Sequence, residues 1–442
     1  MRFRSRLVPL GAVKCHGLPP ALLYAKLQLG NRDSKRAVSL HSLGHVCIGT
    51  VKISLLASPT TITAVTSRVL DVPLPASFRP AWGRGETQNS YFMTLIEVHT
   101  EGGLVGVTAA EARSETAIAI DRFVTPYLIG RDAARPEQLV QILRDAEILG
   151  PPVYCVEIAL WDIAGKAAGL PVSKMWGRFA DRVAVYCATG EVRSAEKRVE
   201  DCLRLLEAGF KAVKLRFHSA EPRNDLRVVE AIRKALGDRI TILVDANQAG
   251  LAPGFEGNRQ WDFRTAVAVA LELERLEVQW LEEPLLRHDY DGLRRLRDRL
   301  GTLRLAGGEN NHGIHEFKLL IDGGCYDILQ PDAILSEGVY QIRKIAALAE
   351  AAGLELAPHT WTHGIGLLAN LQLVASIPNA SWFEFPHEPP GWPAAAFSQM
   401  LVEKPWIDTD GCLAVPDGPG FGIELDYAFV ERCTVERTGW PD

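Results

Sequence analysis

Thr241-Ile242-Leu243-Val244-Asp245-Ala246-Asn247 is an apolar, strand-like run that ends in a carboxylate and leads into a polar segment. Similar runs recur about every 23 to 37 residues, and they end at Lys214-Leu215-Arg216, Glu282-Glu283-Pro284, Glu309-Asn310, Asp332, His359 and Glu384. This interval is the length of one βα unit, and such units repeated around a ring form a (β/α) barrel. Because strand C-termini meet at one mouth of a barrel, we predict that these side chains lie together and form a metal-dependent acid/base site.

The repeating pattern covers residues 183–400. Its eight predicted strands are residues 183–186, 212–215, 241–244, 279–281, 303–306, 327–329, 354–357 and 382–383. Amphipathic segments of helical length separate these runs and predict the helices of the barrel. Residues 62–182 combine strand-like runs with helical periods, which indicates a smaller α+β domain. Residues 401–442 contain short strand-like runs, and we expect them to pack back on that domain.

The composition is that of a globular protein with no nucleic-acid partner. Its 442 residues exceed one typical core, so about two domains are expected. The formal net charge of -6 argues against binding to nucleic acid, and no run approaches the roughly 18 apolar residues of a membrane span. Eight scattered cysteines without a CxxC pair indicate reduced thiols, and we expect a cytoplasmic enzyme.

Residues 1–61 differ from the rest of the chain. They contain nine Lys and Arg residues against a single acid, Asp33, and no helical or strand period persists. An organelle transit peptide has this basic, acid-poor composition. The alternative is that translation begins later and that the stretch is an over-extended start. We favour the alternative, because an ordinary strand begins at Ile62.

Asp245, Glu282 and Glu309 follow successive predicted strands. Each acid taken alone is more often a helix cap or a surface charge than a ligand. Together in a mouth of low dielectric, three carboxylates would raise one another's pKa unless a cation were bound among them. Ligands that are all oxygen favour a hard ion, so we predict one Mg²⁺, with Mn²⁺ as the second choice.

The remaining strand ends supply a base and two cations. Asp332 and His359 follow the next two strands, and a carboxylate bonded to one imidazole nitrogen raises the basicity of the other. We predict that His359 is the base, against the alternative of a structural His–Asp pair. Lys214 and Arg216 alternate along one strand, so both point inward toward a substrate carboxylate, or else form salt bridges to the ligands. Glu384 could donate to a carboxylate oxygen if protonated, or simply pair with Lys214.

These residues resemble the mandelate racemase subgroup of the enolase superfamily over nearly all of residues 62–436. The motifs that resemble it are Ala159-Leu160-Trp161-Asp162-Ile163-Ala164-Gly165-Lys166, Val244-Asp245-Ala246-Asn247-Gln248, Trp280-Leu281-Glu282-Glu283-Pro284, Gly308-Glu309-Asn310, Gln330-Pro331-Asp332-Ala333 and Pro416-Asp417-Gly418-Pro419-Gly420-Phe421-Gly422. The resemblance implies a (β/α)7β modified TIM barrel with an α+β capping domain. It also implies Mg²⁺-dependent removal of the proton α to a carboxylate, through an enediolate intermediate.

The same resemblance implies individual roles. Asp245, Glu282 and Glu309 would be the metal ligands, His359 the base and Asp332 the residue that orients it. Glu384 would contact the substrate. Members of such families commonly form even-numbered assemblies, so a homo-oligomer is expected.

One position departs from the subgroup, whose racemases have a second lysine where this chain has Arg216. Arginine stays protonated near neutral pH, so it clamps a carboxylate well and is a poor base. With one base, loss of a β-hydroxyl is easier than two-way racemisation. We therefore predict dehydration of a sugar acid to a 2-keto-3-deoxy acid. The alternatives are an isomerase (a sugar-acid lactone cycloisomerase, a racemase or an epimerase) and a non-catalytic regulatory member.

A loop over residues 75–89 is predicted to reach from the cap over the mouth and to set specificity. Arg79, Trp82 and Arg84 are its candidates to meet a polyhydroxylated or dicarboxylate substrate, although surface exposure explains each of them equally well. Asn247, two residues beyond Asp245, is a further candidate substrate contact.

Overall fold

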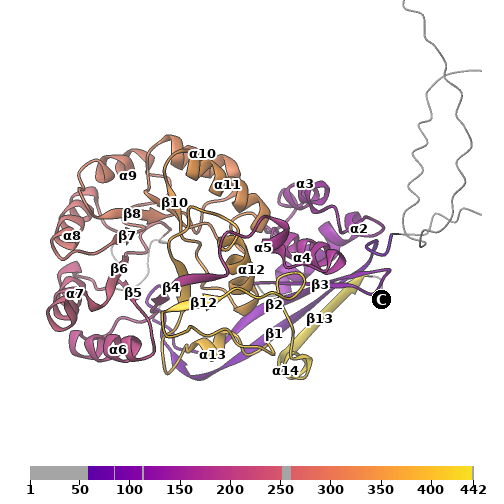
Figure 1. The fold of residues 1–442 in the computed structure, drawn as a ribbon, viewed down its shortest axis with the longest axis horizontal. Helices are drawn as coiled ribbons and strands as arrows, with labels where there is room; N and C mark the ends of the chain where they lie inside the picture. Colours follow the sequence, from indigo (N-terminus) through magenta and orange to yellow (C-terminus); the bar gives the residue numbers. More distant parts are fainter. Residues whose placement is uncertain (1–57, 84, 112–113, 251–259, 441–442) are drawn as a thin grey trace, which may run out of the picture. The chain divides into compact units, whose positions relative to one another are not determined.

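The computed structural model describes residues 58–83, 85–111, 114–250 and 260–440. The predicted extension at residues 1–61 lies almost wholly outside these ranges, and Arg84 lies outside them too. Two parts are visible in Figure 1, a barrel and an antiparallel sheet with its own helices. None of the helices in the described ranges has both the length and the apolar character that crossing a membrane requires.

The barrel is built from parallel strands, each followed by a helix until the last. The strands are β4 (Arg182–Ala188), β5 (Ala212–Arg216), β6 (Thr241–Asp245), β7 (Trp280–Glu282), β8 (Arg304–Gly307), β9 (Ile328–Leu329), β10 (Glu355–Leu356) and β11 (Phe383–Pro386). The helices are α6 (Ala195–Glu207), α7 (Pro222–Leu236), α8 (Phe263–Arg275), α9 (Tyr290–Arg297), α10 (Gly313–Asp322), α11 (Val339–Ala351) and α12 (Gly364–Val374). Because β11 pairs with β4, the last strand returns to the first. The predicted (β/α)7β barrel is confirmed.

Burial on both faces explains why these strands read as unbroken apolar runs. Ile242, Leu243 and Val244 of β6 are all fully buried, as expected for a parallel strand with side chains on one face and helices on the other. The polar residues come where the strands end. Arg216 is in register with Asp245, and Asp245 with Glu282, so their Cα atoms lie at one level of the barrel.

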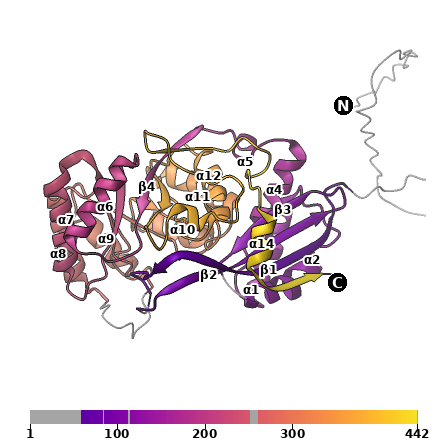
Figure 2. The ribbon, with the colours of Figure 1, turned by 90° about the horizontal axis from the view of Figure 1, so that it is seen from below.

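The cap is a four-stranded antiparallel sheet in the order β13-β1-β2-β3. Its strands are β1 (Ile62–Phe78), β2 (Gln88–Thr100), β3 (Val105–Ala110) and β13 (Thr434–Trp440), and its helices include α1 (Ser114–Ala119), α3 (Pro136–Ala146), α4 (Val156–Ala168) and α14 (Tyr427–Cys433). Figure 2 shows the long strands β1 and β2 reaching from the cap toward the barrel. The C-terminal segment contributes to both parts, because β12 (Cys412–Ala414) pairs with β4 while β13 pairs with β1.

Strand β1 is longer than the sequence suggests, since it continues through Pro73 and Pro75 to Phe78. The predicted loop over residues 75–89 is therefore reduced to residues 79–87. The pairing of β1 with β13 ends at Leu70, so the prolines lie where one side of β1 has no β13 partner. A missing N–H costs least at such an edge.

A buried acid lies between the cap and the barrel. Glu157 of α4 is fully buried, and its Oε2 accepts a hydrogen bond of 3.2 Å from the backbone N–H of Tyr340 on α11. Gly338 is needed beside it, because a Cβ there would lie 2.1 Å from the same oxygen. Burial raises the pKa of Glu157 to about 8 from an ordinary value of 4.5.

We expect the stability of the protein to fall with rising pH in a way that depends on Glu157. Between pH 4.5 and about 8 the folded state keeps a proton that the unfolded state releases, so folding is favoured less as pH rises through this window. Between pH 6 and pH 9, the free energy of unfolding should fall by about 2 kcal/mol less in Glu157→Gln than in the wild-type protein. Urea unfolding at both pH values measures this. Glu200→Gln, at an exposed site on α6, is the matched control, and an equal loss in all three proteins would contradict the assignment.

Candidate active site

The barrel brings the predicted residues to the carboxyl ends of consecutive strands. Lys214 and Arg216 lie on β5, Asp245 and Glu282 end β6 and β7, Glu309, Asp332 and His359 follow β8, β9 and β10, and Glu384 lies on β11. All of these side chains are buried except that of Glu309, which is partly exposed.

The three candidate metal ligands are held by protein partners in this structure. An Nη1 of Arg216 pairs with Asp245, and Lys214 Nζ lies 2.8 Å from Glu282 Oε1. Glu309 Oε2 faces His359 Nε2 at 3.4 Å. Within the described residues, no three His, Cys, Asp or Glu side chains are grouped closely enough to hold a metal in this arrangement.

The chemistry of these donors nevertheless fits a hard cation. Burial raises the pKa of Asp245 well above its ordinary value, and the neighbouring carboxylate of Glu282 raises it further. Adjacent Glu283 is buried as well, and its pKa is raised by desolvation and then by Glu309. Buried carboxylates disfavour one another's ionisation, and a divalent cation that prefers oxygen ligands stabilises their ionised forms. A bound cation would take the place of the present partners on these oxygens.

Two carboxylates keep Lys214 protonated in this structure. Its Nζ lies 2.7 Å from Glu384 Oε1 and also contacts both oxygens of Glu282, at 2.8 and 3.1 Å. Burial alone would lower its pKa, but these two carboxylates raise it well above the ordinary value. Lys214 is therefore positively charged in this arrangement of the site.

Arg216 is held rigidly on every side. Its Nε donates to the carbonyl of Thr189 at 2.7 Å, and its Nη1 donates to Asn247 Oδ1 at 3.2 Å. Its guanidinium carbon lies 4.6 Å from the ring centre of Trp82 and 5.2 Å from that of Trp361. Two aromatic faces and the carboxylate of Asp245 thus keep this cation in place.

His359 has the geometry of an oriented imidazole. Its Nδ1 lies 2.8 Å from Asp332 Oδ2, while Asp332 Oδ1 accepts from the backbone N–H of Ile334 at 2.7 Å. Burial alone would lower the pKa of His359, but Glu309, Glu384 and the bond to Asp332 raise it well above its ordinary value. The hydrogen bond to Asp332 leaves Nε2 as the nitrogen available for proton transfer.

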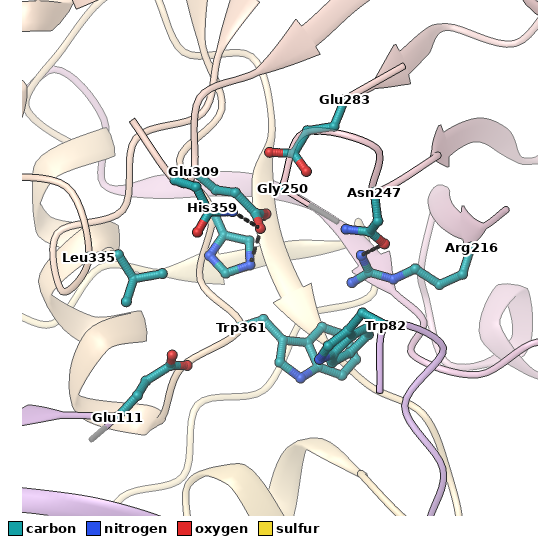
Figure 3. Close-up of a pocket in the computed structure, with 11 residues that line it drawn as sticks. Trp82, Glu111, Arg216, Asn247, Gly250, Glu283, Glu309, Leu335, His359 and Trp361 are labelled. Atoms are coloured by element: carbon teal, nitrogen blue, oxygen red, sulfur yellow. Dashed lines mark hydrogen bonds and ion pairs between the residues drawn. The ribbon is translucent and has the colours of Figure 1, made fainter. Parts of the chain in front are cut away.

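Arg216, Glu309 and His359 open into a cavity of about 310 Å³ that Figure 3 shows, whereas Lys214, Asp245, Glu282, Asp332 and Glu384 are not among its lining residues. Its walls are Trp82, Glu111, Arg216, Asn247, Gly250, Glu283, Glu309, Asn310, Leu335, His359 and Trp361. Of the predicted loop residues, Trp82 therefore reaches the cavity. Arg79 is exposed, is not among the lining residues, and bonds through its backbone N–H to Glu191 Oε1 at 3.1 Å. Asn247, which was also named from the sequence, lines the cavity. Its Oδ1 lies 2.7 Å from Nε2 of His218.

A buried ion pair fixes residues 189–191, which contact both Arg216 and the cap loop at residues 79–87. Glu388 Oε2 accepts from Arg198 Nη2 at 3.0 Å and from the backbone N–H groups of Gly190 and Glu191 at 3.0 and 3.1 Å. The carbonyl of Gly190 in turn accepts from the backbone N–H of Ala81 at 2.8 Å. This contact seats the loop that bears Trp82 on the barrel.

We expect Trp82→Ala to raise KM by about tenfold with a smaller change in kcat. A cation–π contact of this kind contributes roughly 1–2 kcal/mol. Its loss would make the loop and the Arg216 side chain less ordered at the place where the substrate binds. Steady-state kinetics on any accepted substrate measures the effect. Trp82→Phe keeps an aromatic face and should retain most of the wild-type KM. Equal KM values in Trp82→Ala and wild type would show that the loop does not touch the substrate.

Sequence reasoning missed several residues that line the cavity. Trp361 lies two residues beyond His359, and Glu283 adjoins Glu282, where a positive φ of 46° turns the backbone after the strand. Both could have been found by extending the motifs. Glu111 and Leu335 lie in segments with no local pattern, and only the fold brings them to the site.

Comparisons with known proteins agree with this fold. A family model described as enolase C-terminal domain-like matches residues 197–429, and the mandelate racemase / muconate lactonizing enzyme N-terminal domain matches residues 64–177. The L-talarate/galactarate dehydratase of Salmonella typhimurium is 32% identical over 387 residues, or 85% of this chain and 88% of the relative. The D-galactarolactone cycloisomerase of Agrobacterium fabrum is 29% identical over 387 residues, or 83% of this chain and 96% of the relative.

A solved structure gives the same result. The Salmonella typhimurium L-talarate/galactarate dehydratase, liganded with Mg and L-lyxarohydroxamate, superposes with a TM-score of 0.73 at 26% identity. The match covers 86% of this chain and 94% of that chain.

Proposed function

Because this chain belongs to the mandelate racemase / muconate lactonizing enzyme family of the enolase superfamily, we propose that it dehydrates a sugar acid to a 2-keto-3-deoxy acid. The single observation that supports this most is the His359–Asp332 pair, whose other ring nitrogen, Nε2, lies 3.4 Å from Glu309 Oε2. Relatives named dehydratases, such as the L-talarate/galactarate dehydratase described above, support the same reaction class.

In this proposal Asp245, Glu282 and Glu309 hold one Mg²⁺, which Mn²⁺ could replace. The ion would supply positive charge to the substrate carboxylate as negative charge builds up during proton removal. Solved relatives with bound magnesium support the choice of ion. Once the charge of Glu309 is neutralised, the largest influence that raises the pKa of His359 is removed, so the imidazole can accept a proton.

The protein groups then act as follows. His359 Nε2 takes the proton from the α-carbon, and the electron pair of that C–H bond moves toward the carboxylate to give an enediolate. The pair then returns to form the double bond between the α- and β-carbons as the β-hydroxyl leaves. Protonated His359 returns its proton to the leaving oxygen, so water is released and the enol product tautomerises to the keto acid. Lys214 and Arg216 face the developing charge on the carboxylate. Burial alone would raise the pKa of Glu384, but Lys214 beside it lowers that pKa to about 2, so Glu384 stays ionised and contacts the substrate as a hydrogen-bond acceptor.

Cycloisomerisation of a sugar-acid lactone is the second candidate reaction, because the D-galactarolactone cycloisomerase is similar to this chain over nearly the same length. Opening a lactone by β-elimination needs one base, as dehydration does. Racemisation is disfavoured, since Arg216 stays protonated at the position where a second base would be needed.

A screen in D₂O tests the proposal. Mono- and dicarboxylate sugar acids and their lactones are incubated with the Mg²⁺-loaded protein, and products are followed by keto-acid formation and by NMR. Dehydration gives a 2-keto-3-deoxy acid, and cycloisomerisation consumes a lactone with no loss of water. A deuterated epimer of the substrate as the main product would contradict the one-base account.

A further inference from the structure

Glu111 of the cap lies at the junction of two cavities. It follows β3 and lines both the active-site cavity and a second cavity of about 350 Å³, whose walls come from the cap and from the barrel segments that bear Trp361 and Trp392. Trp82 and Trp361 line both cavities as well. Figure 3 shows the carboxylate of Glu111 directed into the active-site cavity, on the side away from Arg216. A substrate held by its carboxylate near Arg216 would therefore extend toward Glu111.

The residues that line the second cavity suit neutral, hydroxylated groups. Its remaining walls are Phe78, Glu86, Gln88, Ser90, Tyr91, Phe92, Thr362 and Trp392. No Lys, Arg or His is found among its lining residues in the described part of the chain, whereas Glu86 and Glu111 both present carboxylates. Carboxylate, amide and hydroxyl oxygens accept bonds from sugar hydroxyls, and the aromatic rings offer apolar faces to the C–H groups of a sugar.

Glu111 interacts electrostatically with Asp332 and His359. The side chain is exposed, and its pKa is raised by partial desolvation first and then by Asp332, with a smaller contribution from Glu309. His359 opposes this shift. At pH 8 most of the Glu111 population is ionised, so a second substrate carboxylate beside it would meet a like charge.

Resting on the function proposed above, we infer that Glu111 selects substrates whose distal end is uncharged and hydroxylated. The substrate is then a monocarboxylate sugar acid, and sugar acids with a carboxylate at both ends are disfavoured. Glu111 accepts a hydrogen bond from a hydroxyl far from the reacting carbon, while the aromatic walls that it shares with Trp82 and Trp361 pack against the sugar chain.

Pairs of sugar acids that differ only at the last carbon test this inference. D-galactonate and galactarate, D-gluconate and D-glucarate, and D-mannonate and D-mannarate are titrated into Mg²⁺-loaded His359→Asn protein by calorimetry at pH 8. Turnover by the wild-type enzyme is measured in parallel. In the pair that binds most tightly, the monoacid should bind about tenfold or more tighter than the diacid, the effect expected of one unfavourable charge contact.

Variants of Glu111 assign the preference to this residue. Glu111→Gln keeps the size and a hydrogen-bond acceptor but removes the charge, so the ratio of the two affinities should fall to within about threefold of unity. Glu111→Arg should invert the ratio. Glu115→Gln makes the same chemical change at an exposed residue outside both cavities and should leave the ratio as it is in the wild type.

The possible failures are distinguishable. If diacids bind and react as well as monoacids, or if Glu111→Gln leaves the ratio unchanged, the inference about Glu111 is wrong while the proposed function stands. If no member of either series binds or reacts, the proposed function fails and the inference fails with it.

Discussion

Replacing His359 by Asn should lower kcat by about 10²–10⁴-fold, the range that a positioned general base contributes. The asparagine still fills the space, and its amide can still bond to Asp332, so the surrounding structure should be kept. It cannot accept a proton at the position of Nε2. Exchange of the α-proton with D₂O should be lost together with turnover, because one group is responsible for both.

Two further measurements separate loss of the base from damage to the site. Calorimetry should show the Mg²⁺ affinity of His359→Asn within a fewfold of wild type, since His359 is not one of the proposed ligands. His315→Asn, at an exposed position on α10, should match the wild-type enzyme in every assay. Retained α-proton exchange in His359→Asn would mean that another group is the base.

Glu309→Gln should weaken Mg²⁺ binding by about 100-fold or more, because loss of a partner that merely orients a ligand already costs roughly 10–100-fold. A neutral amide also stabilises a divalent ion less than a carboxylate does. Turnover at limiting Mg²⁺ should fall with the affinity and recover in part when Mg²⁺ is raised. Calorimetry on the wild-type and variant proteins measures the first effect directly.

The metal-free variant gives an independent check. In the absence of Mg²⁺, Glu309→Gln removes the ion pair with His359, the largest influence that raises the pKa of that imidazole, so NMR should show His359 losing its proton at a lower pH in the variant than in wild type. Glu200→Gln on α6 serves as the control for loss of an acid outside the barrel mouth. Unchanged Mg²⁺ affinity in Glu309→Gln would remove this residue from the ligand set.

The barrel could be predicted because its signal is local and repeated. Buried parallel strands require apolar runs such as Ile242-Leu243-Val244, and the carboxyl end of each strand is where the chain returns to polar residues. One βα unit therefore predicts the next. The positions of Asp245 and Glu282 at adjacent strand ends follow directly from this repetition.

The features that were missed depend on contacts between distant segments. Arg198 and Glu388 are 190 residues apart, and no local pattern marks them as a buried pair. Strand β1 continues through Pro73 and Pro75 because its pairing with β13, at the other end of the described chain, stops at Leu70. Glu111 enters the site only because the cap packs over the barrel mouth.

The central claim is that one divalent cation is held by Asp245, Glu282 and Glu309 beside His359. Crystals grown with excess Mn²⁺ and measured at the manganese absorption edge test it most directly. We expect a single anomalous peak within ligand distance of oxygens from all three side chains. An absent peak, or one whose ligands come from elsewhere in the protein, would contradict it.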